Sequence, residues 1–120
     1  MQSDFRVETH TTGRAVTLTP SGDLDLLSSP ALQRALERLA DTDAELIVVD
    51  LRGLSFMDST GLHVLVQAQQ HAHDAGRRLV LIQGRDQVRR LFDLTGVADG
   101  LTIVDSPEQL LEVDPAAGPS

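Results

Sequence analysis

Apolar and polar side chains alternate with a period of two near the start of the chain. Residues 5–10 and 15–19 show this alternation on either side of Thr12-Gly13, which predicts an antiparallel hairpin with one exposed face. The four residues 20–23 have the composition of a turn, and Leu24-Asp25-Leu26 leads away from it. The chain is therefore expected to begin with a β-hairpin.

The spacing of apolar residues then becomes helical. Ser29 before Pro30 has the order of a capping hydroxyl and a proline at the first helical position, which predicts a helix start. The apolar positions of this helix are Leu32, Ala35, Leu36 and Leu39. Residues 45–51 follow as a nearly continuous apolar run, typical of a central strand that is covered on both faces.

Strands and helices continue to alternate in the second half. The polar turn Asp58-Ser59-Thr60-Gly61 leads into a predicted helix that ends at Gly76. Residues 79–82 predict a buried strand and residues 101–104 a short edge strand. The apolar side of the helix after the turn carries Leu62, Leu65, Val66 and Ala72, and a third helix that ends at Gly96 carries Val88, Leu91, Phe92 and Thr95.

The last part of the chain combines a helix signal and a tail. Ser106-Pro107-Glu108-Gln109 has the cap, first-turn proline and glutamine of a capping box, so a final helix is expected to begin there. Residues 114–120 have the composition of a disordered tail.

This order of elements predicts the fold class. We expect a single α/β domain over residues 1–113, with a mixed β-sheet packed with about four α-helices and an N-terminal hairpin. In such a fold the loops that leave the carboxyl ends of the strands form the functional edge. Asp25 and Asp58 both lie in loops of this kind.

Composition excludes several classes of function. The 120 residues carry a formal net charge of −8, which argues against a nucleic-acid-binding surface. The chain has no cysteine and no lysine, which removes zinc–thiolate sites, Schiff-base chemistry and a P-loop lysine. It shows neither an apolar run of membrane-spanning length nor a signal-peptide pattern, so we expect a cytoplasmic protein that does not bind membranes.

Metal and cofactor sites are not indicated either. His71 and His73 are the only close pair of histidines, and a spacing of two residues puts them on different faces of a helix. The glycines form no phosphate-binding loop. We therefore expect no metal and no cofactor. Nothing in the sequence requires more than a monomer or a weak dimer.

The turn Asp58-Ser59-Thr60-Gly61 has two interpretations. Any of its first three residues could cap the helix and do nothing more, and local chemistry alone favours this. If Asp58 is the cap, however, Ser59 lies in the first turn with its hydroxyl free, and Gly61 keeps bulk away from it. A phosphate on Ser59 would gain from the helix dipole but would be repelled by Asp58, and by Asp25 if the two loops converge.

Enzymatic interpretations of the same region are weak. A nucleophile elbow around Ser59 requires glycine at position 57, where Met57 stands, and His63 lies only one helical turn away. No oxyanion loop is recognisable. Asp50 ends a strand as the phosphoacceptor of a receiver domain does, but without lysine it is better interpreted as a turn or cap carboxylate. We expect no catalytic residue and no enzyme activity.

Four segments together resemble one protein family. They are Gly22-Asp23-Leu24-Asp25, Val48-Val49-Asp50-Leu51, Leu54-Ser55-Phe56-Met57-Asp58-Ser59-Thr60-Gly61-Leu62 and Val88-Arg89-Arg90-Leu91-Phe92-Asp93-Leu94-Thr95-Gly96-Val97. In this order they are similar to the STAS-domain anti-sigma factor antagonists of bacteria. The similarity extends from about residue 5 to residue 111.

The resemblance implies a partner-switching protein. The unphosphorylated form binds an anti-sigma factor that is also a serine kinase, and this releases the sigma factor in transcription regulation of the stress-response kind. The residue-level match makes Ser59 the phosphorylation site, and a PP2C-type phosphatase would reverse the modification. The partner-binding residues implied by the match are Asp25, Asp58, Thr60, Gly61, Leu62 and His63.

Two points stay open within this resemblance. His63 stands where relatives often have glycine or another residue, which concerns the identity of the kinase more than the mechanism. Thr60, one residue away, is a possible second phosphosite. The alternative function is a STAS adaptor subunit of a transporter or of a larger signalling complex, which needs no phosphorylation.

Overall fold

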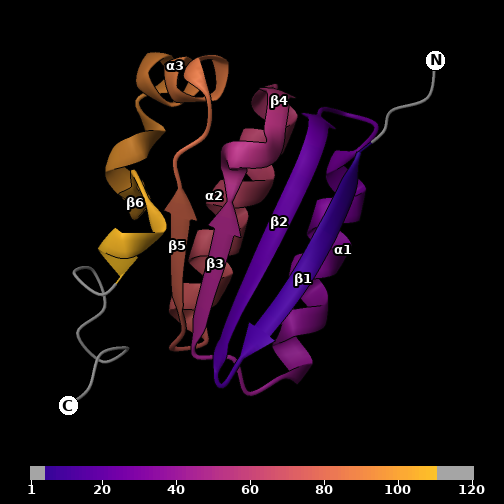
Figure 1. Ribbon diagram of the computed structural model, residues 1–120, viewed down its shortest axis with the longest axis vertical. Helices are drawn as coiled ribbons and strands as arrows, with labels where there is room; N and C mark the ends of the chain where they lie inside the picture. The colour runs from indigo at the N-terminus through magenta and orange to yellow at the C-terminus, as the bar shows by residue number, and fades with distance from the viewer. Residues whose placement is uncertain (1–4, 111–120) are drawn as a thin grey trace.

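A mixed sheet of six strands forms the centre of the computed structural model, which describes residues 5–110 (Figure 1). The strands are β1 (Arg6–Thr12), β2 (Ala15–Leu24), β3 (Leu46–Asp50), β4 (Leu54–Met57), β5 (Arg78–Ile82) and β6 (Ile103–Val104). The α-helices are α1 (Ser29–Arg38), α2 (Ser59–Asp74) and α3 (Asp86–Thr95). In Figure 1, α1 and α2 lie behind the sheet.

The sheet has the order β1-β2-β3-β5-β6, with β4 paired to β2 beside this path. Only β1 and β2 run antiparallel, and the other pairs are parallel. The predicted N-terminal hairpin, the mixed sheet and the α/β class are thereby confirmed.

The predicted turn at residues 20–23 is wrong, because β2 continues through it to Leu24. β1 still pairs with Pro20 and Ser21, and β4 pairs with Gly22 to Leu24. The register shifts between Gly22 and Asp23, and Gly22 has a φ of 96°. β4 advances there from Leu54 to Phe56 while β2 advances by one residue, so Ser55 is the extra residue of a bulge, and such an irregularity bends the strand pair without ending it.

Some other sequence expectations also change. β4 was not predicted, since four residues without a β-branched side chain give little strand signal. Val66 is 37% exposed, and Val64 takes its expected place on the buried side of α2. Three α-helices lie within residues 5–110, against the about four expected. Pro107–Gln109 forms a 3₁₀ turn and Leu110 after it is helical, while the rest of the predicted final helix and the predicted tail lie outside the described residues.

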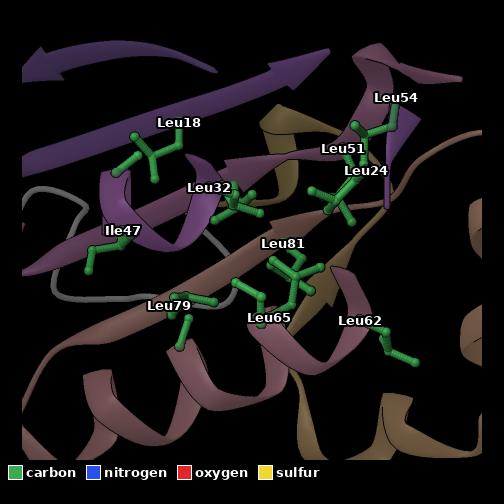
Figure 2. Close-up of a cluster of buried hydrophobic side chains, with 14 of the residues drawn as sticks. Leu18, Leu24, Leu32, Ile47, Leu51, Leu54, Leu62, Leu65, Leu79 and Leu81 are labelled. Atoms are coloured by element: carbon green, nitrogen blue, oxygen red, sulfur yellow. The ribbon is translucent and has the colours of Figure 1, made fainter. Parts of the chain in front are cut away.

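The main core fills the space between the sheet and the helices. Its leucines come from the strands, the connecting turns and the inner sides of α1 and α2 (Figure 2). A smaller cluster on the other side of the sheet contains Leu46, Val48, Val80, Ile82 and Val104. All five residues of β3 are buried, so the prediction of a central strand covered on both faces is confirmed.

Asp50 ends β3 and caps the 3₁₀ turn Leu51–Gly53, as the cap interpretation predicts. Its carboxylate accepts hydrogen bonds from the backbone N of Arg52 at 3.1 Å and from Nε and Nη2 of Arg52 at 2.9 and 2.8 Å. Burial raises the pKa of Asp50, but the hydrogen bonds from Arg52 outweigh it and hold the pKa below its usual value.

We expect Asp50→Asn to lower the free energy of unfolding by about 1–2 kcal/mol at pH 7, because it removes charge-assisted hydrogen bonds to a partly exposed partner. A carboxylate with a lowered native pKa stabilises the fold above its unfolded pKa and loses this effect as the pH falls through its native pKa. In urea unfolding at pH 7 and at about pH 3, the difference in the free energy of unfolding between Asp50→Asn and the wild type should therefore be smaller at the lower pH. The exposed Asp43 provides the control substitution Asp43→Asn. A difference as large in acid as at pH 7 would contradict this assignment.

Candidate partner-docking site

The two acidic loops predicted from the sequence meet at one edge of the sheet. β4 pairs in parallel with the second half of β2, so Leu24 and Met57 are aligned at the ends of the two strands. The backbone N of Asp58 donates a hydrogen bond to the carbonyl O of Leu24 at 3.1 Å. Asp25 and Asp58, which are 33 positions apart by their numbers (58 − 25), each follow one of these aligned residues.

Asp58 is the N-cap of α2. Its Oδ1 accepts hydrogen bonds from the backbone N of Thr60 at 2.9 Å and of Gly61 at 3.2 Å. Ser59 is the first residue of the helix and is exposed. Within residues 5–110 its hydroxyl has no hydrogen-bond partner. The expectation that a capping Asp58 leaves the hydroxyl of Ser59 free is confirmed.

Asp25 organises the neighbouring loop through its carboxylate. Oδ1 accepts hydrogen bonds from the backbone N of Leu27 and of Ser28, both at 3.1 Å. The Ser28 hydroxyl in turn accepts from the backbone N of Asp25 at 2.8 Å and donates to the carbonyl O of Asp23 at 2.7 Å. Half-buried Asp25 therefore shapes the loop that leads into α1.

The cap of α1 differs from the expectation. Ser28 occupies the N-cap position, and Ser29 is the first helical residue. Ser29 is only 2% exposed, and its Oγ has no hydrogen-bond partner within the described residues. The predicted capping role of Ser29 is wrong, because its backbone N already donates to the carbonyl O of Asp25 at 2.8 Å, so Ser29 lies within the first turn and not before it.

This loop exposes two apolar side chains that the sequence reasoning missed. Leu26 is 69% exposed and Leu27 is 84% exposed. Both follow Asp25, in the loop that β4 pairing holds beside the start of α2. The sequence signal for this pair is that two adjacent leucines fit neither the alternation of a strand nor the spacing of a helix. Exposed apolar side chains beside a polar site are typical of a surface that binds another protein.

The remaining predicted site residues divide into exposed and buried ones. His63 is exposed and Thr60 is half-buried, so both line the surface around Ser59. Gly61 and Leu62 are buried and support this surface from beneath. The expectation that Gly61 keeps bulk away from the Ser59 hydroxyl is wrong, because an added Cβ would meet Leu24 Cγ at 2.6 Å and Leu24 Cδ2 at 2.8 Å instead. The glycine lets α2 approach β2 closely.

A further residue, Gln87 of α3, joins the site from 30 positions away. Its Oε1 accepts a hydrogen bond from the backbone N of Met57 at 2.9 Å, and its Nε2 donates one to the carbonyl O of Met57 at 2.9 Å. Met57 directly precedes Asp58. No pattern in the sequence pointed to Gln87, since a polar residue early in a helix is ordinary.

Residues 5–110 hold neither a catalytic pair at Ser59 nor a metal-binding cluster. No hydrogen bond joins His63 to Ser59 there, and no three His, Asp or Glu side chains in that range are placed to hold a metal ion. None of the described helices has the length and apolar character to cross a membrane. The geometry around Ser59 thus consists of a free hydroxyl, the capping carboxylate of Asp58, the loop carboxylate of Asp25 and exposed leucines.

The chain is similar to known proteins along most of its length. A family model described as STAS domain matches residues 6–110. An anti-sigma-B factor antagonist of Listeria monocytogenes is 35% identical to this chain over 83 residues, which cover 69% of this chain and 73% of the relative.

The fold of this chain is similar to that of several solved structures. An anti-sigma factor antagonist from Mycobacterium paratuberculosis has a TM-score of 0.82 at 21% identity, over 92% of this chain and 93% of its own. The antagonist SpoIIAA in its unphosphorylated form has a TM-score of 0.72 at 21% identity, over 91% and 95% of the two chains. The phosphorylated form of the Bacillus SpoIIAA gives 0.66 at 21% identity, over 92% and 99%. The family resemblance and the fold expected from the sequence are confirmed.

We expect Gly61→Ala to lower the free energy of unfolding by about 1–2 kcal/mol. The added methyl group overlaps Leu24, and this overpacking outweighs the gain in helix propensity of about 1 kcal/mol. Gly100→Ala is the matched control, because a Cβ at Gly100 meets no atom within 4 Å. Urea unfolding of both variants tests the close approach, and equal stability of Gly61→Ala and the wild type would contradict it.

Proposed function

The chain belongs to the STAS domain family, and from this premise we propose that it is an anti-sigma factor antagonist controlled by phosphorylation of Ser59. Its unphosphorylated form binds an anti-sigma factor that is also a serine kinase, and the sigma factor is released. Phosphorylation of Ser59 ends the binding, and a PP2C-type phosphatase restores it. These steps take place among cytoplasmic partners.

The observation that carries this proposal is the free, exposed hydroxyl of Ser59 at the start of α2. Asp58 already caps the helix, so Ser59 has no structural task for which its hydroxyl is needed. A kinase can therefore modify it without unfolding the helix start. The named relatives support the same role, since a Listeria monocytogenes relative is an anti-sigma-B factor antagonist and SpoIIAA has a phosphorylated form.

The surroundings of Ser59 explain why a phosphate would act as a switch. A phosphate adds about −1.5 to −2 charges at neutral pH. Asp25 and Asp58 lie at the adjacent strand ends, and the whole chain already carries a net charge of −8. The new charge gains from the N-terminus of α2 but stands in the middle of a docking surface, where desolvation and like charges weaken association.

The docking surface combines charge with apolar contact. Asp25, Asp58, Thr60 and His63 supply polar groups around Ser59, while buried Gly61 and Leu62 keep α2 in place. Exposed Leu26 and Leu27 add apolar area that a partner can cover. We expect these leucines to contribute affinity and the acidic groups to set the sensitivity to phosphorylation.

Phosphorylation at Ser59 is tested with purified protein, ATP and histidine-kinase-like ATPases encoded in the same genome, followed by mapping of the phosphosite by mass spectrometry. We expect one phosphate on Ser59, and none on Ser59→Ala. Ser55→Ala, which changes an exposed serine of β4, should be modified like the wild type. Modification of Thr60 alone, or of neither residue by a kinase that binds the protein, would refute the assignment. The latter result would favour the adaptor function.

Binding of the anti-sigma factor should depend on the charge at position 59. We expect Ser59→Ala to bind like the unphosphorylated wild type and Ser59→Asp to bind at least about tenfold more weakly, as measured by isothermal titration calorimetry. Gln70→Glu adds a negative charge near the other end of α2 and should change the affinity little. Equal affinities of the Ser59→Ala and Ser59→Asp variants would contradict the charge switch.

A further inference from the structure

β4 has a strand neighbour on only one side among the described residues, namely β2. At Met57 its other edge is occupied by the side chain of Gln87. Gln87 Oε1 accepts from the backbone N of Met57, and Gln87 Nε2 donates to the carbonyl O of Met57, both at 2.9 Å. A carboxamide offers the same donor and acceptor as a peptide group. Gln87 thus occupies the place that a further strand would take.

The position of this contact links it to Ser59. Met57 carries the Gln87 contact, and the next residue, Asp58, donates its backbone N to the carbonyl O of Leu24 on the opposite side. The end of β4 is therefore held from both edges. Asp58 in turn holds the first turn of α2 through the backbone N of Thr60 and of Gly61.

We propose that Gln87 is a positioning residue for the switch at Ser59, an inference that rests on the proposed phosphorylation of this residue. Its carboxamide fixes the end of β4 and thereby the direction in which the hydroxyl of Ser59 faces the kinase. Because the contact comes from α3, this helix becomes part of the framework of the site. Gln87 touches neither the phosphate donor nor the hydroxyl itself in this role.

The packing of α3 allows this role to be separated from a purely structural one. Val88 and Phe92 are fully buried and anchor α3 on the core without Gln87. Gln87 itself is exposed, so a change of its side chain leaves these anchors intact. A substitution at Gln87 should therefore loosen the end of β4 while α3 stays in its place.

The test uses Gln87→Met, which keeps the length of the side chain and its suitability for a helix but removes both hydrogen bonds. We expect the rate of phosphoryl transfer to Ser59, measured in a single turnover at saturating kinase, to fall about tenfold because the nucleophile is less well oriented. The kinase concentration at half-saturation should stay within about twofold. Gln70→Met is the matched control, since Gln70 is an exposed glutamine of α2 that binds only Asp74 within the described residues.

Hydrogen exchange and unfolding complete the test. In Gln87→Met the amide of Met57 should exchange at least about tenfold faster, while the amide of Val49 in the central strand and the urea midpoint stay close to the wild type. An unchanged rate of phosphoryl transfer together with faster exchange at Met57 would overturn the positioning role. A change in the kinase concentration at half-saturation with no change in the transfer rate would overturn it as well. If the wild type is not phosphorylated at Ser59 at all, the proposed function fails first, and this inference fails with it.

Discussion

The site depends on the parallel pairing of the second half of β2 with β4. One long strand, β2, pairs with β3 along its first half and with β4 along its second. β2 bends at Gly22, which has a φ of 96° and lies where the pairing with β4 begins. As a result, two loops far apart in sequence begin at aligned residues, Leu24 and Met57. The carboxylates of Asp25 and Asp58, the hydroxyl of Ser59 and the exposed Leu26 and Leu27 are gathered by this one pairing.

The same pairing constrains the residues beneath the site. α2 must start directly after β4, close to the side chain of Leu24, and only a residue without a Cβ fits at the third helical position, Gly61. Leu62 then enters the core beside the strands. The site is thus rigid on its inner side and open on its outer side. A rigid site suits a switch that works by added charge, since no change of fold is needed for a partner to sense it.

The candidate site was predictable where its chemistry is local. Residue types within one turn limit the cap of α2 to Asp58, Ser59 or Thr60, and the structure shows that Asp58 is the cap, which leaves the hydroxyl of Ser59 without a partner in the described residues. The cap of Asp50 on its 3₁₀ turn is local in the same sense. Expectations failed where a distant contact decides. The supposed turn at residues 20–23 is a bent strand because β1 and β4 supply its partners, and Gly61 is required because Leu24, far away in the sequence, lies against it.

The sequence by itself determined the alternation of strands and helices and the continuous burial of β3, and it limited the cap of α2 to three residues, because these follow from hydrophobic periodicity and from bonds between near neighbours. Only the tertiary structure decided that the loops of Asp25 and Asp58 converge, that Gly61 faces Leu24, and that Gln87 closes the edge of β4. These are pairings between residues about 30 or more positions apart in the chain. No local pattern encodes such pairings, because they are selected by the packing of the whole sheet and its helices.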